Sequence, residues 1–396
     1  MKSIVNTQPL YMNAACLVNK WIYFTSYNSN WLFKLNIDTK DIEAVHQLNG
    51  PKTGMKFSGL YYYNNQIWMI PWSIDYIYIY NLINSKLEQL FLPKEMFEYN
   101  HMIKFRKSIL QEKYLWLLPC SYPGIIRIDM DEKVYKIYND WPVNVNFDKT
   151  KKMNFKMMTL YENNLYLFND ACNISIKMST ETGKMTEWKE GYDHSFGVID
   201  KNKLYTCPTK EYEPIKIITL GEIQKTETIS LPNKLWMNRK NYSNFIYSYW
   251  YCKIVGSKVI YMPHEANGII IMDLIKEKIN IIEIDISDYI TPREHKNYAV
   301  YDVLRYKDNY LVIPYQGNKI ILITSNGLIK KEFLLQTDMK YFVQSMNESN
   351  QNNMLQFLET IGHFNVKMTN WGYKDCSMVD KSIGAAINRK ILEGIE

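Results

Sequence analysis

The chain has 396 residues and a formal net charge of +6, from 47 Lys and Arg against 41 Asp and Glu. Its lysines are scattered through polar turns, so no concentrated basic stripe points to a nucleic-acid partner. Gly and Pro number only 16 and 13, which argues against collagen-like or low-complexity sequence, and no apolar stretch is long enough to cross a membrane.

The composition also bears on the compartment. The first residues carry one early charge, Lys2, but no long apolar run, so we expect no signal peptide. Six Cys lie far apart without a C-x-x-C pair, which favours reduced thiols. We therefore expect a cytoplasmic chain. With 46% apolar residues and 32 Tyr, the chain can build a large core of β structure.

One sequence motif recurs along the chain: a polar turn, then an apolar strand that ends on a small residue or a Pro. Successive copies end at Thr25, Pro71, Pro119, Asn169, Pro208, Pro263 and Pro314. The intervals between these positions are 46, 48, 50, 39, 55 and 51 residues. The strands are rich in β-branched and aromatic residues with period-2 stretches, which disfavours a helical solenoid. The spacing predicts an all-β, seven-bladed β-propeller with four-stranded antiparallel blades.

The predicted propeller domain covers residues 1–336. In chain order, its blades are expected at about residues 9–50, 55–93, 101–140, 154–190, 194–232, 245–286 and 297–336. The apolar strand of this motif is the second strand of each blade, which we call strand B. Strands A, B, C and D follow one another from the inside of the ring outward.

A short C-terminal helical tail is expected at residues 337–396. Apolar residues recur at helical spacing within Asn350–His363 and again within Ser377–Ile395. Two interpretations remain open: the tail packs on the propeller, or its last helix docks a partner.

The repeat as a whole resembles the loosely patterned bacterial propellers, such as the streptogramin lyases and kelch-like propellers, over roughly residues 9–336. The kelch double glycine, a repeated Trp-Asp dipeptide and a metal-binding Gly/Asp repeat are all missing from the sequence. The resemblance therefore implies the fold and no particular function.

Strand direction sorts the loops onto two faces. The A–B and C–D turns share one face, which we call the turn face, and they are short and polar. The B–C loops and the D–A links share the other, the loop face. Its links are longest at residues 140–154, 232–244 and 287–297. Because long loops on a rigid scaffold usually carry function, we expect the site on the loop face, around the central opening.

Aromatic residues recur in the B–C loops beside Asn, Gln and Ser. Such side chains suit recognition, because they offer a large contact area at low entropic cost. The favoured function is a recognition scaffold that binds a protein, peptide or glycan segment, without nucleic-acid or membrane partners. The competing interpretation is packing between blades. The candidate ligand-binding residues are Tyr27, Trp72, Tyr122, Tyr212, His264, Tyr315 and Gln316.

Histidines on the loop face raise an alternative function, a metal-assisted lyase or hydrolase. His101, His194 and His264 are the candidate ligands of a divalent metal. Catalytic candidates are His194 and His264 with the carboxylates Glu265 and Asp170. No local ligand pair such as H-x-H is present, so convergence depends on the fold. The competing interpretation is separate hydrogen-bonding histidines and loop caps.

Other catalytic signatures are missing from the sequence. It has no nucleophile elbow, no Gly-rich phosphate loop and no dinucleotide fingerprint. Cys120, Cys172 and Cys207 lie near the B–C edge, but no neighbouring cations would lower their pKa. They are interpreted as buried structural thiols.

Overall fold

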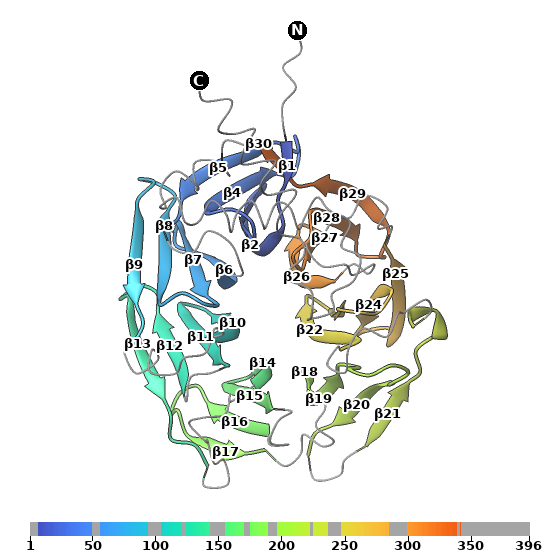
Figure 1. Ribbon diagram of the computed structural model, residues 1–396. Coiled ribbons are helices and arrows are strands. Elements are labelled where there is room, and N and C mark those ends of the chain that lie inside the picture. Colours follow the sequence, from blue (N-terminus) through green and yellow to red (C-terminus); the bar gives the residue numbers. More distant parts are fainter. Residues whose placement is uncertain are drawn as a thin grey trace, which may run out of the picture.

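The computed structural model describes residues 7–49, 56–93, 104–120, 124–142, 155–169, 175–188, 196–221, 225–236, 247–284, 299–338 and 341. These residues form a ring of seven four-stranded antiparallel sheets (Figure 1). The predicted fold class, a seven-bladed all-β propeller, is confirmed. The helical tail is expected at residues 337–396, but residues 337 and 338 belong to a strand that helps to close the ring. Apart from Tyr341, the rest of the expected tail lies outside the described residues. No helix in the described part of the chain is long and apolar enough to span a membrane.

Each blade consists of four strands that follow one another in the sequence. The strands of blades 1 to 4 are β2 (Met12–Val18), β3 (Trp21–Ser26), β4 (Trp31–Asn36) and β5 (Ile42–Gln47); β6 (Phe57–Tyr63), β7 (Gln66–Pro71), β8 (Tyr76–Asn81) and β9 (Leu87–Phe91); β10 (Phe105–Gln111), β11 (Tyr114–Pro119), β12 (Ile125–Asp129) and β13 (Val134–Tyr138); β14 (Phe155–Tyr161), β15 (Asn164–Asn169), β16 (Ser175–Ser179) and β17 (Met185–Glu187).

The remaining three blades follow the same order, and a short 3₁₀ helix, η3 (Asn233–Leu235), comes after blade 5. Their strands are β18 (Gly197–Asp200), β19 (Lys203–Thr206), β20 (Ile215–Thr219) and β21 (Thr226–Ile229); β22 (Tyr249–Val255), β23 (Lys258–Pro263), β24 (Gly268–Asp273) and β25 (Lys278–Glu283); β26 (Val300–Tyr306), β27 (Asn309–Pro314), β28 (Lys319–Thr324) and β29 (Ile329–Leu334).

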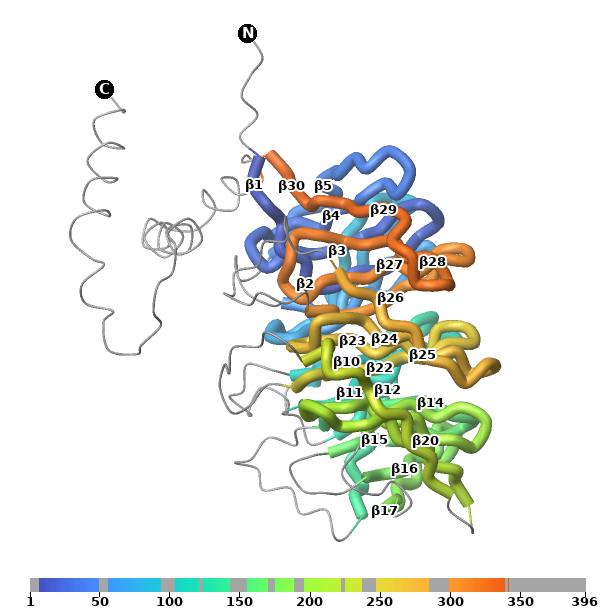
Figure 2. Tube along the Cα trace, turned by 90° about the vertical axis from the view of Figure 1, so that its right-hand side faces the viewer, coloured from blue at the N-terminus to red at the C-terminus, as the bar shows by residue number. Residues whose placement is uncertain are grey.

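The ring closes between blades 1 and 7. The innermost strands contact their neighbours all the way round, including β26 against β2. Two short strands, β1 (Thr7–Pro9) and β30 (Gln336–Asp338), pair antiparallel at this junction (Figure 2). The Met12 amide also donates to the Gly317 carbonyl at 3.0 Å, and the Gln316 amide donates to the Met12 carbonyl at 2.9 Å. Hydrogen bonds between the two ends of the propeller therefore hold the ring shut.

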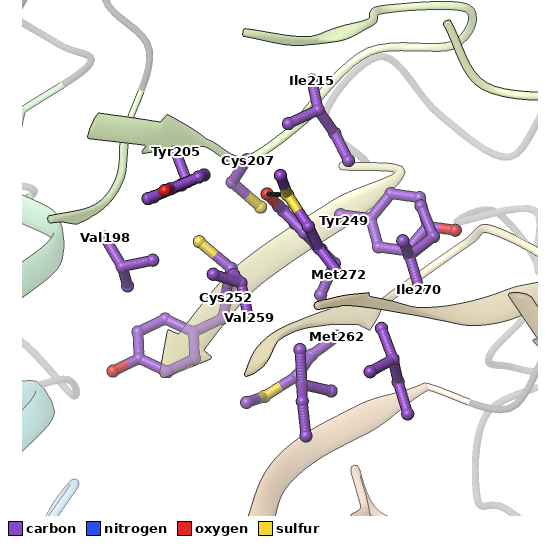
Figure 3. Packing of buried hydrophobic residues seen from close by; sticks show 14 of the residues in the cluster. Val198, Tyr205, Cys207, Ile215, Tyr249, Cys252, Val259, Met262, Ile270 and Met272 are labelled. Atoms are coloured by element: carbon purple, nitrogen blue, oxygen red, sulfur yellow. Dashed lines mark hydrogen bonds between the residues drawn. The ribbon is translucent and has the colours of Figure 1, made fainter. Parts of the chain in front are cut away.

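The seams between blades are filled by apolar and aromatic side chains. Figure 3 shows the seam of blades 5 and 6, where the sulfurs of Cys207 and Cys252 point toward each other among Val198, Tyr205 and Val259. Burial raises the pKa of the Cys207 thiol, and a hydrogen bond with Cys252 adds to the effect. Cys207 and Cys120 are both buried in the structure, as structural thiols are expected to be. The absence of a neighbouring cation is wrong for Cys120, because the Arg106 Nη2 donates to its Sγ at 3.6 Å. Cys172 lies outside the described residues.

The turns on the turn face share one local structure, which explains why they are short and polar. In six of the seven blades, a polar residue ends the third strand and its side-chain oxygen accepts a backbone amide of the following turn. The Asn81 Oδ1, for example, accepts from the Ile83 and Asn84 amides at 2.9 and 3.2 Å. Equivalent bonds are made by Asn36, Asp129, Ser179, Asp273 and Thr324. These side chains are occupied in turn formation, which leaves little chemistry on this face.

Strand A, the innermost strand, carries a β-bulge at its second residue in six of the seven blades. A bulge adds one residue on one strand and redirects its side chain. The described β18 of blade 5 is shorter, begins at Gly197 and pairs without a bulge. The six inserted residues, which we call the bulge ring, are Asn13, Ser58, Arg106, Lys156, Trp250 and Tyr301.

Candidate functional site

The bulge ring lies at the loop-face end of the innermost strands. In blade 6, for example, the bulge falls between the Tyr249–Pro263 and Tyr251–Met262 pairs, at the end of β23 where the B–C loop begins. The residue before each bulge is a fully buried apolar anchor that fixes the strand in its sheet. These anchors are Met12, Phe57, Phe105, Phe155, Tyr249 and Val300. The bulges therefore place six side chains around the inner rim of the loop face, and the backbone does not restrict which residue type stands at each position.

Blades 6 and 7 place four rings together on this rim, which we call the aromatic cluster: Trp250, His264, Tyr301 and Tyr315. The Trp250 ring centroid lies 4.6 Å from that of Tyr315, 5.1 Å from that of His264 and 5.8 Å from that of Tyr301. Tyr301 and Tyr315 stack at 5.9 Å. Edge-to-face and stacked pairs at such distances are favourable beyond their burial.

Local backbone bonds position these rings. His264 and Tyr315 each come directly after strand B, and their amides donate to the Ser248 and Ala299 carbonyls at 3.0 and 2.7 Å. The Trp250 Nε1 donates to the Val300 carbonyl at 2.6 Å, which joins blade 6 to blade 7. The cluster is therefore rigid and spans a blade boundary.

Side chains from opposite parts of the ring meet at Tyr301. The Lys107 Nζ of blade 3 donates to the Tyr301 carbonyl at 3.0 Å and lies 4.0 Å from its ring centroid. It also lies 4.5 Å from the ring of Tyr251. Since blades 3 and 7 are not neighbours, Lys107 bridges across the middle of the ring. Burial raises the pKa of Tyr301, so its phenol is neutral near pH 7.

Positive charge gathers on this inner rim. Burial lowers the pKa of Lys107 to about 8, and the nearby Lys253 adds to this while Asp302 opposes it. The Lys253 Nζ pairs with the Asp302 carboxylate at 3.0 Å. Arg106 and Lys156 occupy the bulge positions of blades 3 and 4, and the Lys156 Nζ lies 4.8 Å from the Tyr247 ring centroid. The rim is thus cationic on one side and aromatic on the other.

The His264 and Glu265 pair is the part of the predicted metal site that the structure describes. The His264 Nδ1 lies 3.5 Å from the Glu265 Oε1, and both side chains are largely buried. Zinc sites in proteins use three or four protein ligands, and the described residues contain no group of three or more His, Cys, Asp or Glu side chains close enough together to hold a metal ion. His101, His194 and Asp170 lie outside the described residues, so the divalent-metal site stays a prediction.

The other predicted ligand-binding residues are spread over the ring. Trp72 packs against the same hydrophobic cluster as Tyr301 and Tyr315. Gln316 is buried and serves the ring closure. Tyr27 lies in blade 1, where its amide donates to the Tyr11 carbonyl.

Blade 5 holds a further predicted residue, Tyr212, which is 64% exposed and contacts Trp236 at 6.0 Å between ring centroids. Tyr122 lies outside the described residues. Among the predicted residues, the structure brings His264, Glu265 and Tyr315 together.

Sequence reasoning missed Trp250, Tyr301, Arg106 and Lys107, because it searched loops and these residues lie on strand A. A usable signal exists in the pattern. A bulky apolar residue opens strand A and a residue of variable chemistry follows, once per repeat, as in Phe105-Arg106. The inserted residue breaks the period-2 alternation of the strand.

The fold defines this protein as a seven-bladed β-propeller, and its inner rim carries cationic side chains on one side and aromatic side chains on the other. No protein-family model and no curated protein matches the chain. Among solved structures it resembles YCF48 bound to D1 peptide, at 9% identity and a TM-score of 0.52, over 80% of this chain and 95% of that one. It also resembles the computationally designed Ika8 protein, at 7% identity and a TM-score of 0.50, over 83% and 88% of the chains.

The streptogramin lyases are among the similar structures too. The virginiamycin B lyase from Staphylococcus aureus matches at 14% identity and a TM-score of 0.40, over 85% of this chain and 90% of that one. At these identities the similarities show the shared propeller architecture alone.

Proposed function

We propose that this protein is a non-enzymatic recognition scaffold that binds a protein or peptide segment on its loop face. The observation that carries the proposal is the aromatic cluster. Trp250 is partly exposed there, and the buried rings of Tyr301 and Tyr315 hold it in place from the neighbouring blade. Residues of this kind dominate binding energies at protein interfaces, since they bury a large area with few rotatable bonds.

The architecture agrees with such a role. A propeller presents loops from every blade on a rigid frame, which is a common arrangement for binding sites. One propeller that resembles this chain, YCF48, has been solved bound to D1 peptide. A glycan segment fits aromatic side chains as well, so binding is measured for both ligand types.

The test compares wild-type protein with Trp250→Ala and with Tyr62→Ala as a matched control. Tyr62 is an exposed aromatic residue beside the A–B turn of blade 2, on the turn face. Proteins captured from a lysate are purified, and their affinity for each variant is measured by calorimetry. Glycans are tested on an array.

We expect Trp250→Ala to weaken binding by at least about thirtyfold, as at interface hot spots, and Tyr62→Ala to leave it unchanged. Equal affinity of wild type and Trp250→Ala for every purified partner would overturn the proposal. Glycan binding that depends on Trp250 would reassign the ligand.

One observation favours the second candidate, a metal-assisted lyase or hydrolase: the 3.5 Å approach of His264 to Glu265. This function needs a further ligand, for which the sequence offers His101, His194 or Asp170. Metal analysis of the purified protein tests it. Stoichiometric zinc or another divalent metal that is lost in His264→Ala would replace the scaffold proposal with the enzyme.

A further inference from the structure

The six bulge positions are equivalent in the backbone, but the residues on them differ by blade. Blades 1 and 2 carry Asn13 and Ser58, both buried. Blades 3 and 4 carry the cations Arg106 and Lys156, and blades 6 and 7 carry the aromatic residues. Equivalent positions with such different chemistry make the inner rim two-sided.

The cationic side reaches toward the aromatic side. Lys107 follows the bulge of blade 3 and crosses to Tyr301 of blade 7. The ammonium of Lys156 in blade 4 lies over the ring of Tyr247, at the start of blade 6. A ligand on this rim would therefore touch cations and aromatic rings at the same time.

Among the described residues, the Lys107 ammonium contacts the rings of Tyr251 and Tyr301 and forms no ion pair with a carboxylate. Its hydrogen bond goes to a neutral carbonyl, that of Tyr301. The nearest carboxylate, Asp302, is already engaged, since it pairs with Lys253 at 3.0 Å and accepts the Val303 amide at 2.7 Å. A half-buried ammonium in this position gains from an added anion.

Two other buried lysines near the loop face lie at junctions between neighbouring blades. The Lys104 ammonium forms an ion pair with the carboxylate of Asp75. The Lys56 ammonium is enclosed by the Ser29 carbonyl and the Asn30 side chain, which tie blade 2 to the B–C loop of blade 1. Both act within the fold at blade junctions, whereas Lys107 lies at the inner rim beside the aromatic cluster.

We infer that the segment recognised by the loop face is acidic. Its carboxylates lie against Arg106, Lys107 and Lys156, and its apolar or aromatic side chains pack on Trp250, which is partly exposed and is backed by the buried Tyr301. This inference rests on the proposed function and specifies the chemistry of its ligand. Arginine and lysine beside aromatic rings suit a carboxylate-bearing peptide, because the fork of Arg matches a carboxylate and the rings take the neighbouring side chains.

The test begins with a random dodecapeptide library displayed on phage and selected on the full-length protein at low salt. We expect the selected sequences to be enriched in Asp and Glu next to aromatic residues. The best peptide is then synthesised with a counterpart in which every Asp and Glu is Asn or Gln. Fluorescence anisotropy measures both peptides against wild type and variants.

The variants are Lys107→Gln and Arg106→Gln, with Lys86→Gln as the matched control. Lys86 is exposed in a C–D turn on the turn face. We expect each rim variant to weaken the acidic peptide by about tenfold, as for a lost charged hydrogen bond. Lys86→Gln should leave affinity unchanged, the amide counterpart should bind weakly, and added salt should weaken binding. Thermal unfolding confirms that each variant is folded.

The outcomes separate the two proposals. Selected peptides that lack acidic residues but still require Trp250 overturn the acidic specificity and leave the scaffold function standing. Equal binding of the acidic peptide by wild type and Lys107→Gln likewise overturns the acidic specificity and leaves the scaffold function standing. If the selection enriches no sequence and Trp250→Ala binds every purified partner as tightly as wild type does, both proposals are overturned. Retention of nucleic acid that depends on Arg106 would replace the peptide with a different ligand.

Discussion

The phenol hydroxyl of Tyr301 donates a 2.6 Å hydrogen bond to the backbone carbonyl of Ser58, which joins blade 7 to blade 2. Both residues occupy bulge positions, so the bond runs along the inner rim and passes the junction where the ring closes. The backbone carbonyl of Tyr301 accepts a hydrogen bond from the Lys107 ammonium of blade 3. One residue thus links three blades and holds the aromatic cluster in place.

Tyr301→Phe should destabilise the protein by about 1–3 kcal/mol, because it removes the donor to a buried carbonyl while keeping the ring. Urea unfolding measures the loss. Tyr212→Phe is the control, since that side chain is mostly exposed, and its stability should equal wild type. An unchanged midpoint for Tyr301→Phe would show that the bond contributes nothing to closure.

Lys56 should make stability rise with pH. Burial lowers its pKa from the ordinary 10.5 to about 7. Between these values the unfolded chain binds a proton that the folded chain lacks, so the penalty of the buried charge, full below pH 7, is relieved as pH rises. The stability of wild type relative to Lys56→Met should increase by about 2 kcal/mol from pH 7 to pH 9.

Urea unfolding at pH 6, 7, 8 and 9 provides the comparison for Lys56. The exposed Lys86→Met is its control and should show no such trend relative to wild type. A flat difference between wild type and Lys56→Met across this range would contradict the depressed pKa.

Lys107 should make binding of the acidic peptide sensitive to pH. Its pKa of about 8 means that it carries its charge at pH 7 and loses it as pH rises past that value. Affinity of wild type should therefore fall roughly fivefold between pH 7 and pH 9. Lys107→Arg keeps its charge throughout this range and should bind with little pH dependence. Identical profiles by anisotropy for the two proteins would exclude Lys107 as the titrating group.

Gly197 should be intolerant of a side chain. A Cβ there would lie 2.1 Å from the backbone oxygen of Tyr205 on β19, and a sheet strand cannot yield as a flexible side chain can. We expect Gly197→Ala to cost about 1–3 kcal/mol in urea unfolding. Gly59→Ala meets only side-chain atoms, at 3.0 Å or more, and should cost less. Equal stability of the two variants would argue against close packing of the first two strands in blade 5.

Part of this site could be predicted from the sequence and part could not. His264, Glu265 and Tyr315 were found because each follows a recurring strand and must emerge on the loop face. Trp250 and Tyr301 lie within strand A and not in a loop, and the bulky apolar residue before each of them marks the inserted position only when the repeats are compared with one another. The register that marks it comes from pairing with strand B.

The sequence by itself determined the repeat and the number of blades, and it predicts the division into a plain and an elaborated face. These follow from short-range physics: period-2 apolar strands, polar turns and a regular spacing. Only the tertiary structure decided that the ring closes through β1 and β30 and that Lys107 meets Tyr301. Those contacts join residues far apart in the chain, and their geometry depends on ring curvature and bulges to which every blade contributes.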